Sequence, residues 1–515
     1  MMKRNREQSR VKPAPKDKSC TRRAFLKGAC APLLLPASVW AAKPSEKPRL
    51  ALIGCGHQGR GLLHGFLGQD LVVAAVCDCD KARLADRQKV VADYYKSRPE
   101  LGVAADACRA TGDFREIIAD KSIDMVCVAT PDHWHAHIAI AAMKAGKDVY
   151  CEKPLTYNIE EALQMMQVAR ETGRIVQTGA MQRSGVEFRT ACEIVRNGLI
   201  GRVTHVDANF GGPSRPHRDY ENPANAAQEG APNPDVDFNM WCGPAPLVKY
   251  SDRLAPRGVH AFYPMFWRHD DLFASGECGD WGAHHLDIAQ WGLGLDEGGP
   301  VRVVRSTAAP AKDPFYGGRR QRGVQLVCAD GCVIRHNPFG SWWGTIFYGT
   351  EGIVAVNRGK FAVWLGKGVD PTDGKIQKGL MDATFDGQER VAFWGVAPWD
   401  KAQEPVPGSN RSMLDAVNKA IKRFSLKKAA VKLYKSQGHV GDFVKCCASR
   451  QTPCSGVEVG ARASILCQLC NTSYIHDAGF EWDPVKNTFA AGTGDAAWMK
   501  RRPSAVCQIE KTPCR

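Results

Sequence analysis

The sequence predicts an α/β fold that opens with a parallel sheet alternating with helices. An apolar run at residues 50–53 leads into the glycine turn GCGHQG and then into a helical pattern. A second apolar run, residues 71–77, ends at Asp78. The stretch SIDMVCVATPDHWHAHIAIAAMKAGKDVYCEKP then repeats strand, loop, helix and strand. This rhythm is typical of βαβ units in a parallel sheet.

The glycine turn at Gly54, Gly56 and Gly59 is expected to hold a dinucleotide. Glycines permit the tight turn and let backbone N–H groups approach a pyrophosphate at a helix N-terminus. Asp78 lies nineteen residues after Gly59, where an acidic side chain accepts ribose hydroxyls of NAD and repels the 2′-phosphate of NADP. NAD is therefore predicted over NADP, although Arg83 could accommodate the phosphate if Asp78 turned away.

Lys153 follows the strand pattern DVYC and precedes a proline. A residue before proline favours extended geometry, so Lys153 is expected at the carboxyl edge of the sheet, where open α/β sheets hold ligands. His133, His135 and His137 alternate at a helix start, and no cysteine or carboxylate cluster accompanies them. Capping and cofactor packing are therefore predicted for them, and no metal site. The predicted cofactor-binding residues are Gly54, Gly56, His57, Gln58, Gly59, Asp78, Thr130, Pro131, His133, His135, Glu152 and Lys153.

A second cluster of chemical interest is the run GDWGAHHLDIAQWGLG. Asp280, His284 and Asp287 are spaced four and three apart, which places them on one face of a helix. A histidine suits removal of a hydroxyl proton near neutral pH, and the Lys153 cation suits a developing alkoxide. The helix alone would favour a structural role, but alongside the CEKP run Lys153, Asp280 and His284 are the predicted catalytic residues, with Asp280 orienting His284 or binding a second hydroxyl. The alternative is a helix-capping aspartate and a core histidine.

In order and spacing, GCGHQG, ATPDHWH, CEKP and GDWGAHHLDIAQWGLG resemble the Gfo/Idh/MocA oxidoreductases, named for glucose–fructose oxidoreductase and inositol dehydrogenase. The resemblance implies an N-terminal Rossmann domain, residues 48–176, and a C-terminal α/β domain, residues 177–485, with a large, open, mostly antiparallel sheet. The family pattern DxGxHxxD, which carries the catalytic Asp and His, maps onto Asp280 and His284. Residues expected near the substrate are Gln182, Arg183, Trp267, Arg268 and Asp287. A surface salt bridge is the alternative role for Arg268.

Residues 1–42 resemble a twin-arginine export signal. Arg22 and Arg23 precede a short apolar stretch that is broken by Pro32 and Pro36, which is too short to span a membrane. The resemblance implies the twin-arginine translocase as a partner and a periplasmic location; a disordered basic tail is the alternative. This segment carries ten Lys and Arg and two Asp and Glu, so the formal net charge of +15 falls to about +7 without it. The remaining basic residues form no stripe, and no nucleic acid is expected.

The C-terminal region contributes weaker signals. The chain has 20 cysteines, but its single CxxC, Cys467 to Cys470, lacks a second well-spaced pair. Buried thiols or a few disulfides are therefore predicted, and no metal. Residues 211–237 and 367–410 are expected to be long loops, and residues 486–515 a flexible basic tail.

Three functions remain open at this point. The first is an NAD-dependent oxidoreductase that acts on a secondary hydroxyl of a sugar, glycoside or cyclitol, with tightly bound cofactor. The second is an NAD-dependent glycosidase or lyase, in which transient oxidation at C3 permits elimination and is then reversed. The third is a non-catalytic scaffold that contains NAD. The resemblance also implies a homo-oligomer.

Overall fold

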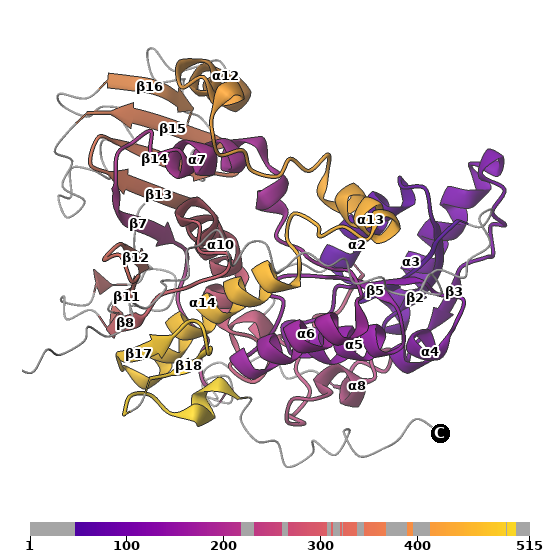
Figure 1. Cartoon of the computed structure of the whole chain (residues 1–515). Helices are drawn as coiled ribbons and strands as arrows, with labels where there is room; N and C mark the ends of the chain where they lie inside the picture. Colours follow the sequence, from indigo (N-terminus) through magenta and orange to yellow (C-terminus); the bar gives the residue numbers. More distant parts are fainter. Residues whose placement is uncertain are drawn as a thin grey trace, which may run out of the picture. The chain divides into compact units, whose positions relative to one another are not determined.

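The computed structural model describes residues 47–217, 231–259, 266–305, 311–312, 320–321, 323–336, 344–366, 389–394, 412–490 and 492–500 (Figure 1). The predicted export signal lies outside these residues. No helix among them is long and apolar enough to cross a lipid bilayer.

The N-terminal half is built on a six-stranded parallel sheet with the order β3-β2-β1-β4-β5-β6. Its strands are β1 (Arg49–Ile53), β2 (Val72–Cys77), β3 (Arg109–Thr111), β4 (Met125–Val128), β5 (Asp148–Cys151) and β6 (Val176–Thr178). Strands β2, β4 and β5 are buried along their whole length, as expected for a sheet covered on both faces. This strand order is that of a Rossmann fold, so the predicted nucleotide-binding architecture is confirmed.

The helices of this half are α2 (His57–Leu67), α3 (Lys81–Lys96), α4 (Phe114–Ala119), α5 (Asp132–Lys144) and α6 (Ile159–Thr172). Local sequence sets their ends. Asp80 caps α3 by accepting from the backbone N–H groups of Ala82 and Arg83, and Asn158 caps α6. Gly173 ends α6 in the left-handed region, at φ +63°. These caps fix the connections at the carboxyl edge of the sheet.

The second half contains a ten-stranded sheet with the order β16-β15-β14-β13-β7-β12-β11-β8-β17-β18. Only the β7–β12 pair is parallel among the described pairings of this sheet, so the predicted open, mostly antiparallel sheet is confirmed. Its strands are β7 (Val203–Asn209), β8 (Arg302–Arg305), β11 (Val324–Val327), β12 (Val333–His336), β13 (Gly344–Gly349), β14 (Gly352–Asn357), β15 (Lys360–Leu365), β16 (Glu389–Trp394), β17 (Phe480–Asp483) and β18 (Thr488–Phe489). A separate pair joins β9 (Ala311–Lys312) and β10 (Arg320–Gln321).

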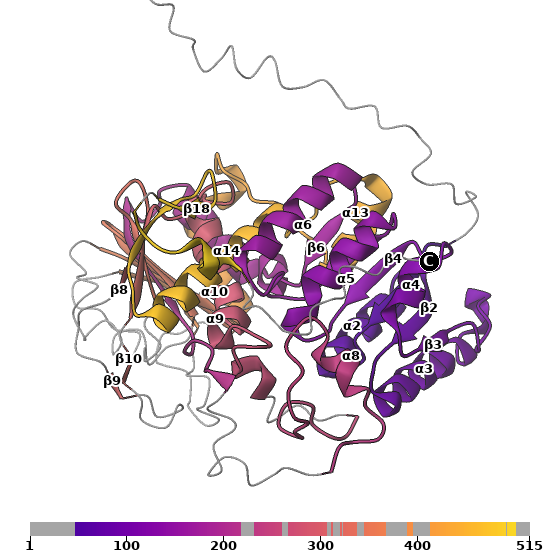
Figure 2. The same cartoon turned by 90° about the horizontal axis from the view of Figure 1, so that it is seen from below.

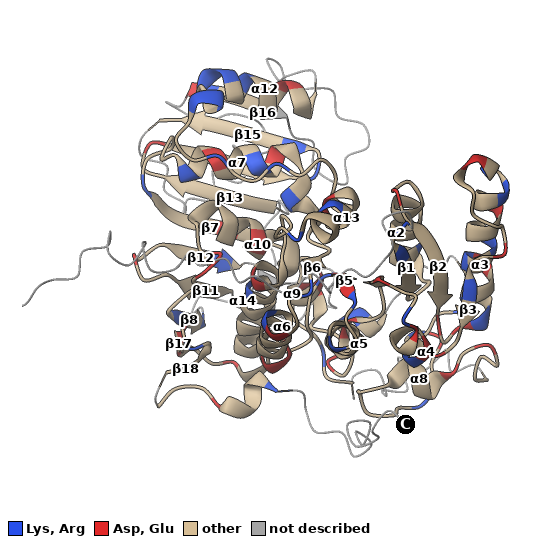
Figure 3. Ribbon diagram, turned by 45° about the vertical axis from the view of Figure 1, so that its right-hand side comes forward, with Lys and Arg blue, Asp and Glu red and all other residues tan. Residues whose placement is uncertain are grey.

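Helices α7 (Val186–Arg196), α10 (Gly282–Leu293), α12 (Met413–Arg423) and α14 (Val457–His476) pack on this sheet. Figure 2 shows α10 and α14 between the sheet and the nucleotide-binding half. Helix α14 also contacts α6 and β6, and most of its residues are buried because it is covered on several sides. In Figure 3 charged residues are frequent on helices such as α3 and α12, whereas strands β13 to β16 carry few of them.

The C-terminal chain returns to the nucleotide-binding half. Helix α13 (His439–Ser449) packs on α2, where Phe443 meets Phe66 edge to face with ring centroids 6.1 Å apart. All sixteen cysteines in the described part of the chain are free thiols, and fourteen are buried. The Cys328 N–H donates to the Cys332 carbonyl across the tight turn that joins β11 and β12.

The chain beyond residue 485 differs from the expected flexible tail as far as residue 500. It forms β18 and a 3₁₀ helix at Ala496–Met499. Trp498 stacks on His476 with ring centroids 4.2 Å apart, and Phe489 packs on Phe480 and Trp482. These aromatic contacts hold a segment whose basic composition alone predicts flexibility. Residues 501–515 lie outside the described residues.

Candidate active site

The glycine turn connects β1 to α2 at the carboxyl edge of the parallel sheet. Gly54 has φ +99°, and a Cβ added there would lie 2.5 Å from the carbonyl group of Ala129. A Cβ on Gly59 would lie 2.0 Å from the Gly54 carbonyl oxygen. At Gly56, by contrast, the nearest atom to an added Cβ is a guanidinium nitrogen of Arg83, at 3.5 Å. Gly54 and Gly59 are therefore required by packing, whereas Gly56 faces a cleft.

The cleft has the polar groups that a dinucleotide needs. Asp78 accepts hydrogen bonds from the Cys55 and Asp80 backbone N–H groups at 2.6 and 2.8 Å. A carboxylate has about four acceptor positions, so Asp78 keeps positions for a ribose. The hydroxyl of Thr130 also lines the cleft and is buried without a hydrogen-bond partner among the described residues. An open cradle at Gly56, this hydroxyl and this carboxylate fit the pyrophosphate and ribose of NAD.

Most of the predicted cofactor-binding residues line this cleft. They are Gly54, Gly56, His57, Gln58, Asp78, Thr130, Pro131, His135, Glu152 and Lys153. Gly59 packs behind the turn. His133 does not line the cleft. Its Nε2 lies instead 2.9 Å from the carbonyl oxygen of Trp241, in the second half of the chain. Among the residues that the structure describes, no group of three His, Cys, Asp or Glu side chains is arranged to hold a metal ion.

Glu152 connects the glycine turn to the loop that carries Lys153. One carboxylate oxygen accepts from the Gln58 amide at 2.8 Å, and the other accepts from the Lys153 backbone N–H at 3.1 Å. Burial raises the pKa of Glu152, and the charge of Lys153 opposes this rise. Glu152 therefore fixes the backbone of the loop that follows β5, and the Lys153 side chain pairs with a different residue.

The Lys153 side chain reaches the second half of the chain, where its ammonium group pairs with Asp280. Asp280 is the last residue of α9 (Gly276–Asp280) and also pairs with Arg268, at 2.8 Å. The Lys153 and Asp280 side chains are only 14% and 17% exposed. Burial raises the pKa of Asp280, but the charges of Arg268 and Lys153 outweigh it and hold the pKa well below its usual value. Asp280 is thus ionised between two cations.

His284 lies in the first turn of α10, one turn after Asp280. Its Nε2 lies 2.8 Å from a guanidinium nitrogen of Arg358. A guanidinium only donates hydrogen bonds, so Nε2 is the acceptor and the imidazole is neutral. Burial, followed by the charges of Lys153 and Arg358, lowers the pKa of His284 well below its usual value.

Arg358 is a site residue that the sequence analysis missed. It occupies the turn between β14 and β15, and its guanidinium lies 4.9 Å from the centre of the Trp281 ring. The only local signal is the turn sequence Asn357-Arg358-Gly359, in which Gly359 has φ +67°. Nothing in that turn indicates a contact with a histidine 74 residues earlier.

Two further carboxyl groups near Asp280 have raised pKa values. Burial and the neighbouring charge of Asp280 raise the pKa of Glu277 to about 8. Burial raises the pKa of Asp132 to about 7, against the charges of Lys153 and Arg268. Near neutral pH Glu277 is mostly protonated and Asp132 is about half protonated, so Asp280 is the carboxylate that most fully balances Lys153 and Arg268. The site therefore favours negative charge that develops on a bound oxygen.

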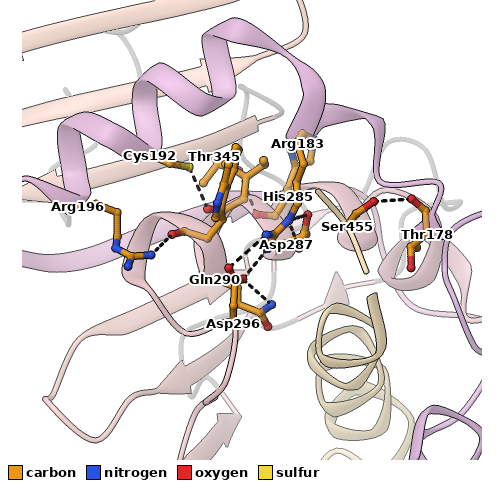
Figure 4. A network of polar contacts seen from close by, with 12 residues as sticks. Thr178, Arg183, Cys192, Arg196, His285, Asp287, Gln290, Asp296, Thr345 and Ser455 are labelled. Carbon is orange, nitrogen blue, oxygen red and sulfur yellow. Dashed lines mark hydrogen bonds and ion pairs between the residues drawn. The ribbon is translucent and has the colours of Figure 1, made fainter. Parts of the chain in front are cut away.

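The substrate roles predicted for Arg183 and Asp287 do not fit the structure. Their side chains are 2% and 1% exposed and form a two-pronged ion pair with each other, with nitrogen–oxygen distances of 2.8 Å (Figure 4). Arg183 also binds Asp296, at 2.6 Å. In the structure Asp280 ends α9, whereas Asp287 lies in the next helix, α10, where Arg183 holds it in the core. The predicted spacing therefore did not reveal how deeply Asp287 is buried.

The other predicted substrate residues divide between the cleft and the core. Trp267 and Arg268 line the cleft. Arg268 pairs with Asp280, so the surface salt bridge considered as its alternative role is replaced by a partly buried contact within the site. Gln182 is buried outside the cleft lining, and its amide atoms have no hydrogen-bond partner among the described residues.

Comparison with known proteins identifies the family of the chain. The oxidoreductase family's NAD-binding Rossmann fold matches residues 49–180, and its C-terminal alpha/beta domain matches residues 185–338. Together these matches cover more than half of the 515 residues. The chain belongs to the Gfo/Idh/MocA oxidoreductase family. Residues 49–180 therefore form an NAD-binding domain.

Individual relatives within the Gfo/Idh/MocA family differ in their named activities. A glycosyl hydrolase family 109 protein of Shewanella amazonensis is 31% identical over 32% of this chain and 35% of its own length. The levoglucosan dehydrogenase of Pseudarthrobacter phenanthrenivorans is 29% identical over 46% of this chain and 50% of its own. Inositol 2-dehydrogenase 1 of Mycolicibacterium vanbaalenii is 34% identical over 27% of this chain and 39% of its own. The chain thus spans between about a third and a half of these curated relatives.

Solved structures of similar fold extend over more of the chain. A levoglucosan dehydrogenase in complex with NADH and levoglucosan is 20% identical, with a TM-score of 0.49, over 84% of this chain and 99% of that one. An aldose-aldose oxidoreductase from Caulobacter crescentus in complex with glycerol is 16% identical, with a TM-score of 0.49, over 85% of this chain and 100% of that one.

Proposed function

We propose that this protein is an NAD-dependent oxidoreductase that acts on a secondary hydroxyl of a sugar, glycoside or cyclitol. The observation that carries the proposal is the junction of Lys153, from the edge of the NAD-binding cleft, with Asp280 and its helical neighbour His284. A cation, a carboxylate and a neutral imidazole are the groups that removal of a hydroxyl proton requires. The similarity to levoglucosan and inositol dehydrogenases supports the substrate class.

Each side chain has a separate role in this proposal. His284 is unprotonated near neutral pH, so its Nε2 can take the proton of the substrate hydroxyl once the hydrogen bond from Arg358 to this atom breaks. Lys153 stabilises the negative charge on the oxygen, and Asp280 keeps Lys153 and Arg268 at that position. When bound in the cleft, NAD supplies the acceptor for the hydride of the hydroxyl-bearing carbon.

A second candidate is redox-neutral cleavage of a glycoside at the same residues. The similarity to glycosyl hydrolase family 109 proteins supports it. The two candidates differ in product, because the dehydrogenase accumulates NADH, whereas the cleavage releases an aglycone without net NADH. A non-catalytic scaffold is the weaker candidate, because it does not explain why Lys153, Asp280 and Arg268 are paired at the edge of the NAD-binding cleft.

Lys153→Ala and His284→Ala are each expected to lower turnover by about 10² to 10⁴, because each removes an acid–base or charge-stabilising group. NAD should remain bound in both variants. The assay is NADH formation or aglycone release with a panel of hexoses, glycosides and inositols. Lys144→Ala, at an exposed position of α5, is the matched control. Full activity in both active-site variants would overturn the assignment.

Arg358→Gln is expected to move the acid limb of the pH–activity profile to higher pH, by about one unit. The charge of Arg358 helps to keep the pKa of His284 low. Removing that charge raises this pKa, so His284 becomes protonated, and inactive as a base, at a higher pH than in the wild type. Arg302→Gln, on the exposed edge of β8, serves as control. An acid limb that stays in place would show that His284 is not the titrating base.

We also propose that residues 1–42 direct export through the twin-arginine translocase to the periplasm. The support is the sequence alone, in which Arg22 and Arg23 precede a short apolar stretch. Changing both arginines to lysine is expected to leave the protein in the cytoplasmic fraction, while the wild type is recovered from the periplasm. Equal distribution of both proteins would contradict export by this route.

A further inference from the structure

The NAD-binding cleft is bounded on one side by residues 235–257, here called the covering segment. The segment belongs to the second half of the chain and includes α8 (Phe238–Cys242), which lies beside α4 and α5 in Figure 1. Members of the segment that line the cleft opposite the glycine turn are Val236, Met240, Trp241, Leu254, Ala255 and Pro256. These side chains are mainly apolar, so they exclude water from the cleft.

The covering segment is joined first to the loop that follows Asp78. The Lys81 N–H donates to the Asp235 carbonyl, and the Asp237 N–H donates to the Cys79 carbonyl, both at 2.9 Å. Val236 forms an antiparallel bridge with Asp80 between these bonds. Since Asp78 is the ribose-binding carboxylate of this fold, the backbone of the segment is fastened beside the position of the ribose.

A second attachment runs through Arg83. Its guanidinium donates to the Pro256 carbonyl at 2.8 Å and lies 3.3 Å from the Asp80 carboxylate. The same guanidinium is the atom group nearest to an added Cβ at Gly56. Arg83 therefore spans from the glycine turn to the covering segment. Because the Arg83 guanidinium is hydrogen-bonded to Pro256, it is less able to bind a 2′-phosphate, which agrees with the prediction of NAD over NADP.

A third attachment lies at the start of α5. The Trp134 indole N–H donates to the Met240 carbonyl at 3.0 Å, and His133 contacts the Trp241 carbonyl. A Cβ on Gly243 would lie 2.0 Å from the Trp134 ring, so the two surfaces are in close contact. Behind this contact is an apolar cluster of Cys242, Ala245, Leu254, Trp267, Phe273 and Ala274. The covering segment is thus held both by the start of α5 and by this apolar cluster.

We infer that the covering segment closes the adenosine half of the cleft and retains the dinucleotide, which leaves only when this segment detaches. Three attachments hold the covering segment against the cleft, one of them beside Asp78, and each would have to break for the cleft to open. One protein chain therefore keeps one NAD through successive turnovers. This inference rests on the proposed function only in naming NAD as the ligand.

The test measures retention of the nucleotide by full-length protein. The purified protein is gel-filtered without added NAD and denatured, and the supernatant is assayed for nicotinamide nucleotide by absorbance and mass. The wild type is expected to hold about one NAD per chain. Arg83→Met should lose it about ten- to a hundredfold faster, because a charged hydrogen bond is removed. Lys89→Met, at an exposed position of the same helix, is the matched control and should retain it.

A second variant separates retention from direct contact with the nucleotide. Asp237 caps α8 by accepting from the Met240 N–H at 3.0 Å, and it does not line the cleft. Asp237→Ala should therefore also release NAD faster, by roughly fivefold, since it loosens only the covering segment. Faster loss in Arg83→Met alone would overturn the inference, because Arg83 would then act on the nucleotide itself.

The outcomes for the inference and for the proposed function are independent. A wild-type protein that carries no NAD after gel filtration but turns over when NAD is added would overturn the inference and leave the proposed function intact. A protein that retains NAD, with Lys153→Ala as active as the wild type, would support the inference and overturn the proposed function. Activity of Arg83→Met that returns on addition of NAD would support both.

Discussion

The ion pair between Lys153 and Asp280 is the contact on which the site depends. Lys153 follows β5 of the parallel sheet, and Asp280 ends α9 of the second half, so the pair joins the two parts of the chain at the cleft. Arg268 adds a second cation to the same carboxylate. Removing one partner from such a partly buried group leaves an uncompensated charge, which is costly. The arrangement therefore positions the catalytic groups and also holds the two halves in register.

Helix α10 carries both the chemistry and its support. Its first turn holds His284 near Asp280, and Asp287, three residues after His284, is fixed by Arg183 in the core. The Thr345 hydroxyl donates to the His285 carbonyl and ties the same helix to β13 (Figure 4). A helix anchored by these two contacts can present its first residues with little freedom. This is the condition for a base that must meet one hydroxyl in one orientation.

The local parts of the site could be predicted from the sequence. The glycine turn, Asp78 and Lys153 follow apolar strands, and the helical spacing of Asp280 and His284 is a property of the backbone. Arg358 and the covering segment could not be predicted, because they reach the site through contacts between distant parts of the chain. Asp287 was placed near the substrate from its helical spacing after His284, and Arg183 from its position at the start of the second domain, and neither position reveals the depth of burial. The segment from 486 to 500 was misjudged because composition does not reveal where Trp498 packs.

The pairing of Lys153 with Asp280 can be measured without knowledge of the substrate. The free energy of unfolding is determined by denaturant titration for the wild type, Lys153→Met, Asp280→Asn and the double variant. If the two residues act as a buried pair, the double variant is less destabilised than the sum of the single variants, by about 1 to 3 kcal/mol. Single effects that add within about 0.5 kcal/mol would show that the two side chains are not coupled, and would contradict this account of the site.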